Sequence, residues 1–171
     1  QSSVRATSAV AITVSESTGT VLAAVQSTEQ YQPQEQICVA PGLHEHHFFR
    51  MTFDAHGVGA LEAYQQTKAP GMSIEALLES GDPAVQTILE STAWRLQALV
   101  QQLNGAGTIV STGGGARSKR WVQIKAEILN RTFIIPACNE AACLGAAMIA
   151  ARGVGALNNV QDWVHIKERI E

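Results

Sequence analysis

The chain has 171 residues, of which 46% are hydrophobic and 16% are charged, enough apolar material for one core, and this excludes a linker or a disordered tail. The net charge of −3 and the scattered basic residues argue against a nucleic-acid-binding surface, and no apolar run reaches the roughly 18 residues that a membrane span needs. The three cysteines form no CxxC pair and leave one over, so we expect a reducing, cytoplasmic setting rather than a secreted disulfide scaffold.

The first part of the chain is expected to form strands. Two β-prone runs, Ala9 to Val14 and Thr20 to Val25, flank a polar link from Ser15 to Gly19 and predict a hairpin. The stretch "HHFFRMTF" predicts a further extended segment. Because the chain opens almost at once into strand-like alternation, without a starter methionine or a cap, we expect a fragment of a longer protein.

The middle of the chain predicts helices. "GVGALEAYQQT" suits a short helix, and Ser73 is placed to cap a second one that ends at Gly81. A long amphipathic helix follows and is expected to end at Asn104-Gly105. The apolar residues that predict its buried face are Val85, Ile88, Leu89, Trp94, Leu96, Leu99, Val100 and Leu103.

The last third predicts alternating strands and helices. "TIVS" and "TFIIP" read as short buried strands, and Ser118 can cap a helix between them. That helix would bury Trp121, Ile124, Ile128 and Leu129. The run "NEAACLGAAMIAARG" predicts a slim helix that can lie tightly against a sheet or another helix. The order of strand, glycine loop, helix, strand and helix indicates an α/β or mixed α+β fold with a hairpin in front.

The glycine loop Gly113–Gly115 lies between a predicted strand and a predicted helix. Such a loop lets backbone N–H groups approach an anion or a flat ring, and the following helix N-terminus adds partial positive charge. The loop has neither the GxxxxGK[ST] nor the GxGxxG spacing, so it belongs to neither of those phosphate-binding classes. A tight turn in which glycine only satisfies backbone geometry is the alternative.

The turn "SESTGT" is a second candidate. Its Ser17, Thr18, Gly19 and Thr20 offer N–H and O–H groups that could surround phosphate oxygens, although an ordinary hairpin turn has the same composition. Two small-residue turns, each after a strand, fit a nucleotide with its phosphates at one turn and its base at the other.

The stretch "STGGGARSKRWVQIKAEILNRTFIIPACNEAACLGAAMIAA" closely resembles the C-terminal lobe of the FGGY carbohydrate kinases, which include xylulokinase and glycerol kinase. The matching motifs are Gly113 to Ala116 and Glu140 to Ala147, together with the "STGT" turn and the helix "TILESTAWRLQALVQQL". The resemblance implies an actin-like ATPase (ribonuclease H-like) fold and a single C-terminal ATP-binding lobe over residues 1–171.

The resemblance also implies a site. Thr18, Gly19 and Thr20 would lie at the ATP phosphates. The residues at the adenosine would be Gly113, Gly114, Gly115, Ala116 and Lys119, the last of these where some family members have asparagine. Members transfer the γ-phosphoryl group of Mg-ATP to a sugar hydroxyl, so ATP and Mg²⁺ are the implied cofactors.

The catalytic base is expected outside this chain. The family's aspartate lies about twenty residues before the "GT" turn, which here falls at or before Gln1, and the first aspartate in the chain is Asp54. We therefore expect an N-terminal sugar-binding lobe of the same protein and a carbohydrate as partners, and we leave a homodimer open. A non-catalytic nucleotide-sensing or protein-interaction module with the same fold, or a structural domain that binds no nucleotide, are the alternatives.

Three other clusters receive plainer interpretations. The histidines of "LHEHHFF" at His44–His47 lack the HExxH spacing of a metal site, and we expect no metal site in this chain. The run "RSKR" could attract ATP phosphates, but a charge run at a helix start is usually solvated. Cys138 and Cys143 are expected to be small buried thiols.

Overall fold

The computed structural model describes residues 12–19, 21–42, 46–138, 140–157 and 164–171. Its strands are β1 (Ile12–Thr18), β2 (Leu22–Thr28), β3 (Cys38–Pro41), β4 (Phe48–Asp54), β5 (Thr108–Thr112), β6 (Phe133–Pro136) and β7 (Ile166–Ile170). Its helices are α1 (Gly59–Lys68), α2 (Ile74–Glu79), α3 (Pro83–Gln102), a short 3₁₀ turn (Gly114–Arg117), α4 (Lys119–Leu129) and α5 (Ala141–Gly153).

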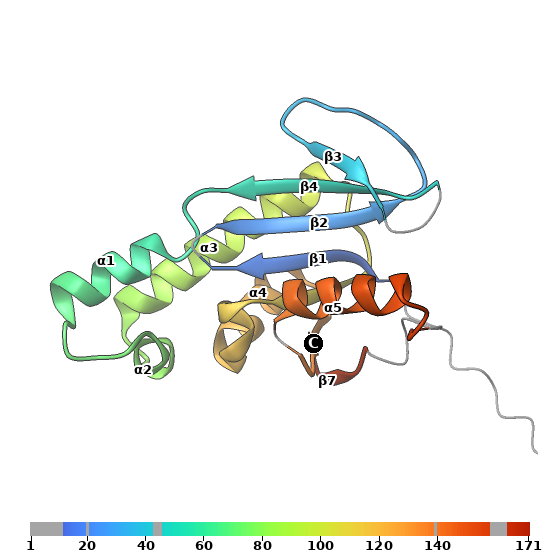
Figure 1. Cartoon of the computed structure of the whole chain (residues 1–171). Coiled ribbons are helices and arrows are strands. Elements are labelled where there is room, and N and C mark those ends of the chain that lie inside the picture. Colours follow the sequence, from blue (N-terminus) through green and yellow to red (C-terminus); the bar gives the residue numbers. More distant parts are fainter. Residues whose placement is uncertain (1–11, 20, 43–45, 139, 158–163) are drawn as a thin grey trace, which may run out of the picture.

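One mixed sheet organises the fold, with the strand order β3-β4-β2-β1-β5-β6-β7 among the described residues (Figure 1). The central strands β1, β5 and β6 run parallel to one another, whereas the outer pairs are antiparallel. The parallel strands are connected by α3 and α4, as expected, because parallel neighbours need long crossover connections. The α/β arrangement with a hairpin in front is therefore confirmed.

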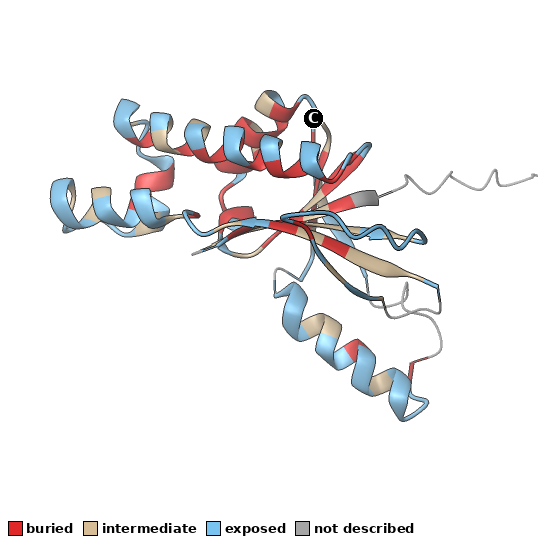
Figure 2. Cartoon of the chain, turned by 90° about the horizontal axis from the view of Figure 1, so that it is seen from above, coloured by how far each residue is buried: buried red, intermediate tan, exposed pale blue. Residues whose placement is uncertain are grey.

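The helices cover the two faces of the sheet unequally. Helices α3 and α4 pack on one face, and α5 lies on the other (Figures 1 and 2). The main core lies between the sheet and the helices α3 and α4, where Leu22, Leu96 and Phe133 are fully buried. A second apolar cluster joins α1 and α2 to the first half of α3 and to Trp121 of α4. This second cluster positions α1 and α2 beside the glycine loop.

The front hairpin has a tighter turn than the sequence suggested. Strand β1 continues through most of the predicted link and ends at Thr18, and the register pairs Thr18 with Leu22. The link prediction of Ser15 to Gly19 is therefore wrong. Alternate residues of the link face the interior, where Glu16 and Thr18 are buried and hydrogen-bonded to each other. Polar residues can continue a strand when their side chains find partners inside.

Helix α3 buries the predicted stripe with one exception. Val85, Leu89 and Leu96 are fully buried, but Trp94 is 56% exposed, so its placement on the buried face is wrong. Ala93 occupies the stripe instead, with 0% exposure. Helical spacing rather than residue size decides which side chain faces the sheet.

Helix α5 is more exposed than its composition suggested. Met148 is its one buried residue among those described, and an added Cβ at Gly145 would meet nothing within 4 Å. The prediction that this helix packs tightly is thus wrong for the described part of the chain. The thiols of Cys138 and Cys143 are free and exposed, which also contradicts the prediction that they are buried.

Candidate functional site

The two small-residue turns lie side by side at one edge of the sheet. Strands β1 and β5 are parallel neighbours, and their register pairs Glu16 with Ser111 and Ser17 with Thr112. The carboxyl ends of adjacent parallel strands emerge at the same edge, which is where ligands bind in open α/β sheets. The turn after Thr18 and the loop that starts at Gly113 therefore meet in space, although they are far apart in the sequence.

Two glycines of the loop are required by the protein's own packing. A Cβ added at Gly113 would lie 2.8 Å from the Ser17 hydroxyl oxygen, and Gly113 also has a φ of +75°, which favours glycine. A Cβ added at Gly115 would lie 2.9 Å from the Cβ of Thr18. Gly113 is thus fixed by its backbone conformation and by Ser17, and Gly115 by the close approach of Thr18, so both glycines have a packing reason that needs no ligand.

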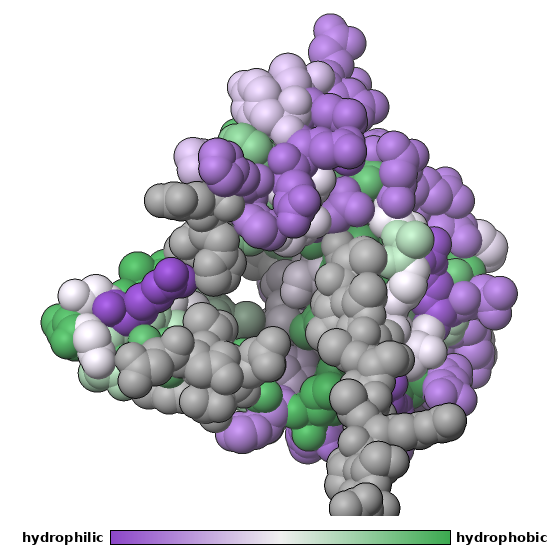
Figure 3. All heavy atoms as spheres, turned by 90° about the vertical axis from the view of Figure 1, so that its right-hand side faces the viewer, coloured by the Kyte–Doolittle hydropathy of each residue, from purple (hydrophilic) through white to green (hydrophobic). Residues whose placement is uncertain are grey.

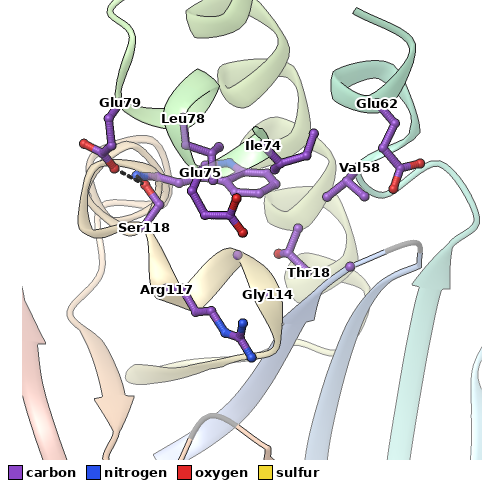
Figure 4. Close-up of a pocket in the computed structure, with 13 residues that line it drawn as sticks. Thr18, Val58, Glu62, Ile74, Glu75, Leu78, Glu79, Gly114, Arg117 and Ser118 are labelled. Atoms are coloured by element: carbon purple, nitrogen blue, oxygen red, sulfur yellow. Dashed lines mark hydrogen bonds between the residues drawn. The ribbon is translucent and has the colours of Figure 1, made fainter. Parts of the chain in front are cut away.

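Two other glycines face open space. An added Cβ at Gly19 would meet nothing within 4 Å, and at Gly114 it would meet only the Thr18 carbonyl oxygen, at 3.9 Å. Both residues line a cavity of about 420 Å³ between the two turns and helices α1 and α2 (Figure 4). The residues that line the cavity are Thr18, Gly19, Val58, Glu62, Ile74, Glu75, Leu78, Glu79, Gly114, Gly115, Arg117, Ser118 and Trp121.

Polar contacts attach α2 to the start of α4 and so fix one wall of the cavity. The Ser118 hydroxyl accepts a hydrogen bond from the Trp121 backbone N–H at 3.2 Å, which confirms the predicted cap. The same hydroxyl donates to the Glu79 carboxylate at 2.9 Å (Figure 4). Arg120 donates to the Leu78 carbonyl oxygen at 3.1 Å. The cavity wall is thus tied to the helix that follows the glycine loop.

The cavity carries more negative than positive side chains. Glu62, Glu75 and Glu79 line it together with one guanidinium group, that of Arg117 (Figure 4). The pKa of the Glu75 carboxyl lies below its usual value because its own backbone N–H and the Ser73 hydroxyl stabilise the charged form, with a smaller contribution from Arg117. A polyanionic ligand therefore has its favourable surroundings at the glycine loop and at Arg117, whose guanidinium group also pairs with Glu140 at 2.8 Å.

The predicted site residues divide into two groups. Thr18, Gly19, Gly114 and Gly115 lie together on the cavity. Gly113, Ala116 and Lys119 are not among the lining residues, and Thr20 lies outside the described residues.

Two of the residues outside the cavity lining have other partners in the structure. Ala116 is 3% exposed and closes the 3₁₀ turn by donating its N–H to the Gly113 carbonyl oxygen at 3.2 Å. The Lys119 ammonium group forms an ion pair with Glu168 of β7. Lys119 therefore pairs with β7 and does not line the cavity.

Sequence reasoning missed the walls that come from α1 and α2. Val58, Ile74 and Leu78 reach the cavity only because the second apolar cluster folds these helices over the glycine loop. Arg117 and Trp121 were visible in the sequence but were given other roles, namely a solvated charge run and a buried helix face. The position of Arg117 two residues after the glycine loop was the available signal.

No group of three or more His, Cys, Asp or Glu side chains among the described residues could hold a metal ion. His44 lies outside those residues, and the His47 ring nitrogen lies 3.7 Å from a Glu29 carboxylate oxygen.

In the part of the chain that the structure covers, no helix is both long and apolar enough to cross a membrane.

Solved structures with the same fold include sugar kinases. The chain superposes on a ligand-bound xylulose kinase from Lactobacillus acidophilus with a TM-score of 0.79 at 13% identity, over 92% of this chain and 42% of that one. A glycerol kinase with ADP from Plasmodium falciparum gives a TM-score of 0.77 at 13% identity over the same shares. The fold is therefore the actin-like ATPase fold of the FGGY sugar kinases, as expected from the sequence.

Sequence comparison identifies the family. Residues 4–154 match the FGGY family of carbohydrate kinases, C-terminal domain, and the chain belongs to this family. It is 32% identical to the xylulose kinase of Bacillus subtilis (strain 168) over 82 residues, which are 46% of this chain and 16% of that protein. It is 37% identical to the autoinducer-2 kinase of Salmonella paratyphi B over 57 residues, which are 33% and 11%. The chain thus spans less than half the length of the relatives that it matches.

Proposed function

We propose that the chain is the ATP-binding lobe of a sugar kinase that transfers the γ-phosphoryl group of Mg-ATP to a carbohydrate hydroxyl. The observation that carries this proposal is that the two small-residue turns, one after β1 and one after β5, open onto a single cavity of about 420 Å³. Open space at Gly19 and Gly114 leaves their backbone accessible to a ligand. Family membership and the fold shared with an ADP-bound glycerol kinase support the same ligand class.

The cavity walls suggest how the nucleotide lies. The backbone of the turn at Thr18 and Gly19 would lie at the phosphates, with Arg117, which also pairs with Glu140 at 2.8 Å, as the nearby cation. The loop at Gly114 and Gly115 would face the adenosine. The apolar residues Val58, Ile74, Leu78 and Trp121 supply the surface on which a base can be buried.

Mg²⁺ would enter with the nucleotide phosphates and offset part of their charge, which is relevant in a cavity lined by three carboxylates. The described residues do not form a metal site of their own. What this chain would contribute to phosphoryl transfer is therefore positioning of the nucleotide and exclusion of water from it.

The base and the sugar contacts are assigned to an N-terminal lobe of the same protein. Relatives of known structure are more than twice as long as the part that this chain covers, which leaves room for such a lobe. The exposed apolar residues of α5 and of the turn after it are the surface that we assign to it. Ile149 is 53% and Val154 is 81% exposed, and green apolar side chains show on the left-hand projection of Figure 3, the end of α5.

Calorimetric titration of the chain with Mg-ADP and Mg-ATP tests nucleotide binding. The Gly114→Val variant should bind the nucleotide at least about tenfold more weakly. The valine side chain would fill space that the ligand needs, and the ligand would lose its contacts with the backbone of the loop. Gly71→Val is the matched control, since Gly71 also has open space but is outside the cavity lining. Absence of binding by the unsubstituted chain, or equal binding by Gly114→Val, would reject the proposal.

Phosphoryl transfer requires the protein with both lobes. The proposal predicts that such a protein consumes ATP in the presence of a carbohydrate, whereas a nucleotide-sensing module would bind nucleotide without transferring phosphate to any sugar. A coupled assay of ADP release with a panel of pentoses, hexoses and polyols distinguishes the two. The sugar dependence of ADP release is the decisive reading.

A further inference from the structure

A charged pair lies buried directly beneath the glycine loop. Lys125 of α4 and Glu16 of β1 both have 0% side-chain exposure, and the Lys125 Nζ lies 2.8 Å from a Glu16 carboxylate oxygen. Neither residue lines the cavity. Lysine and glutamate side chains are almost never fully buried unless they are paired, as these two are.

The pair belongs to a closed network that includes Thr18. The Lys125 ammonium also donates to the Thr18 hydroxyl oxygen at 2.8 Å, and that hydroxyl donates to the second Glu16 carboxylate oxygen at 2.8 Å. The Ser111 hydroxyl of β5 donates to Glu16 as well. The network therefore joins β1, β5 and α4 at the edge of the sheet where the two turns begin.

Thr18 connects this network to the cavity. It is one of the lining residues, and its Cβ is the atom closest to an added Cβ at Gly115, at 2.9 Å. Its carbonyl oxygen is the nearest neighbour of an added Cβ at Gly114, at 3.9 Å. The side chain that Lys125 and Glu16 hold is thus the side chain against which the glycine loop rests.

Lys125 also contacts the cavity wall from behind. Its ammonium group lies 5.0 Å from the centre of the Trp121 ring, within the range of a cation–π interaction. Trp121 lines the cavity, and its ring atom Cζ3 lies 3.3 Å from an added Cβ at Gly115. One buried cation therefore supports both the phosphate-side turn and the wall beside the loop.

A contribution to folding stability is a poor explanation for the burial of Lys125 and Glu16. Moving two charges out of water is costly, and apolar residues of similar volume are often equally or more stabilising at such positions. What an apolar pair could not do is orient the Thr18 hydroxyl, which here both accepts and donates a hydrogen bond. A group held by two charged partners is confined to one orientation.

We propose that Lys125 and Glu16 are positioning residues, which hold Thr18 and the loop Gly113–Gly115 in the geometry that binds the nucleotide without touching it. This inference rests on the proposed function only in taking the cavity ligand to be a nucleotide. The ordering of the two turns by the pair is a separate and separately measurable claim.

The test compares single and double substitutions. Lys125→Met leaves the Glu16 charge unpaired and should destabilise the chain, so it cannot by itself separate stability from positioning. The double variant Glu16→Gln with Lys125→Met has no buried charge, and its melting temperature should recover most of the loss. With Mg-ADP, calorimetry should nevertheless show at least about tenfold weaker binding for the double variant, because Thr18 has lost its charged partners.

Hydrogen exchange provides a reading that needs no nucleotide. In the double variant, the backbone amides of Gly19 and of Gly113–Gly115 should exchange at least about tenfold faster, while those in the middle of α3 keep their rates. Unchanged exchange at the two turns would overturn the inference, whatever the nucleotide result. If the unsubstituted chain binds no nucleotide but the turns loosen, the proposed function fails, and the ordering of the two turns by the pair stands without a role in nucleotide binding.

If the double variant has loosened turns but the affinity of the unsubstituted chain, the pair orders the turns without serving the ligand, and the inference is wrong in its functional part. If affinity falls but the turns exchange normally, the pair acts through another route, and the positioning claim is wrong. Support requires both changes in a variant whose melting temperature has recovered.

Discussion

Replacing Gly115 by alanine should destabilise the chain although it adds a single methyl group. The added Cβ would lie 2.9 Å from the Thr18 Cβ, 3.3 Å from the Trp121 ring and 3.4 Å from the Lys125 ammonium nitrogen. The Thr18 Cβ is attached directly to the backbone of β1, so it can move only if the strand moves. Overpacking of this kind typically lowers the free energy of unfolding by about 1–3 kcal/mol. Because the Thr18 Cβ is a rigid neighbour, we expect a cost in the upper part of that range, about 2–3 kcal/mol.

Gly114→Ala is the matched control for this prediction. Its nearest neighbour would lie at 3.9 Å, an ordinary contact, and its φ is outside the left-handed region. Both substitutions reduce the freedom of the unfolded chain and so gain about 0.4–1 kcal/mol, a contribution that cancels when the two variants are compared. The free energy of unfolding of Gly115→Ala should therefore lie about 2–3 kcal/mol below that of Gly114→Ala.

Urea denaturation followed by circular dichroism measures this difference, and thermal melting checks it. For a chain of this size, about 2–3 kcal/mol corresponds to a melting temperature lower by roughly 4–12 °C. If the two alanine variants unfold at the same urea concentration with the same slope, the close approach of β1 to the loop does not exist as described. The packing argument for Gly115, and the support that it lends to the positioning pair, would then be refuted.

Three further predictions test the scaffold. Ser118→Ala should cost about 1 kcal/mol in urea unfolding, because it removes the cap of α4. Leu96→Ala should cost about 2–5 kcal/mol by the same measurement, whereas Trp94→Ala, at a site that is 56% exposed, should change it by no more than about 0.5 kcal/mol. The Tyr64 hydroxyl donates to Asp82 at 2.6 Å and is the main cause of a lowered Asp82 pKa. The ionised Asp82 therefore stabilises the folded chain above its unfolded-state pKa of about 4, and this contribution is lost as the pH falls through the lower folded-state pKa. The melting temperature should accordingly fall less between pH 6 and pH 2 for Tyr64→Phe than for the unsubstituted chain. An equal fall in both proteins would show that the Tyr64 hydrogen bond does not lower the Asp82 pKa.

Local patterns in the sequence predicted the helices and strands of the last two thirds except β7 (Ile166–Ile170), for which no strand was predicted. Ser73 and Ser118 cap helices as predicted, because a cap depends on residues within one turn of each other. The spacing of apolar residues in α3 predicted its buried face apart from Trp94. The glycine and alanine motifs were specific enough to indicate the family, which the match over residues 4–154 confirms.

The sequence singled out the two turns and placed Thr18, Gly19, Gly114 and Gly115 among the candidates, whereas the parallel pairing of β1 with β5 that brings the turns together comes from the structure. Only the tertiary structure shows that Gly19 and Gly114 face open space whereas Gly113 and Gly115 lie against β1. Gly113 and Gly115 are held by β1, from which they are separated by nearly a hundred residues, and no local pattern reports such a contact.

The buried pair of Lys125 and Glu16 shows the same limit most clearly. In the sequence, Glu16 lies in a polar predicted turn and Lys125 in an amphipathic helix. A charged residue in either of these settings is expected to be exposed to solvent. Their burial follows from the packing of α4 on the sheet, which brings together residues 109 positions apart. Secondary structure is determined by neighbours along the chain, whereas the cavity and the groups that support it depend on contacts that exist only once the sheet has formed.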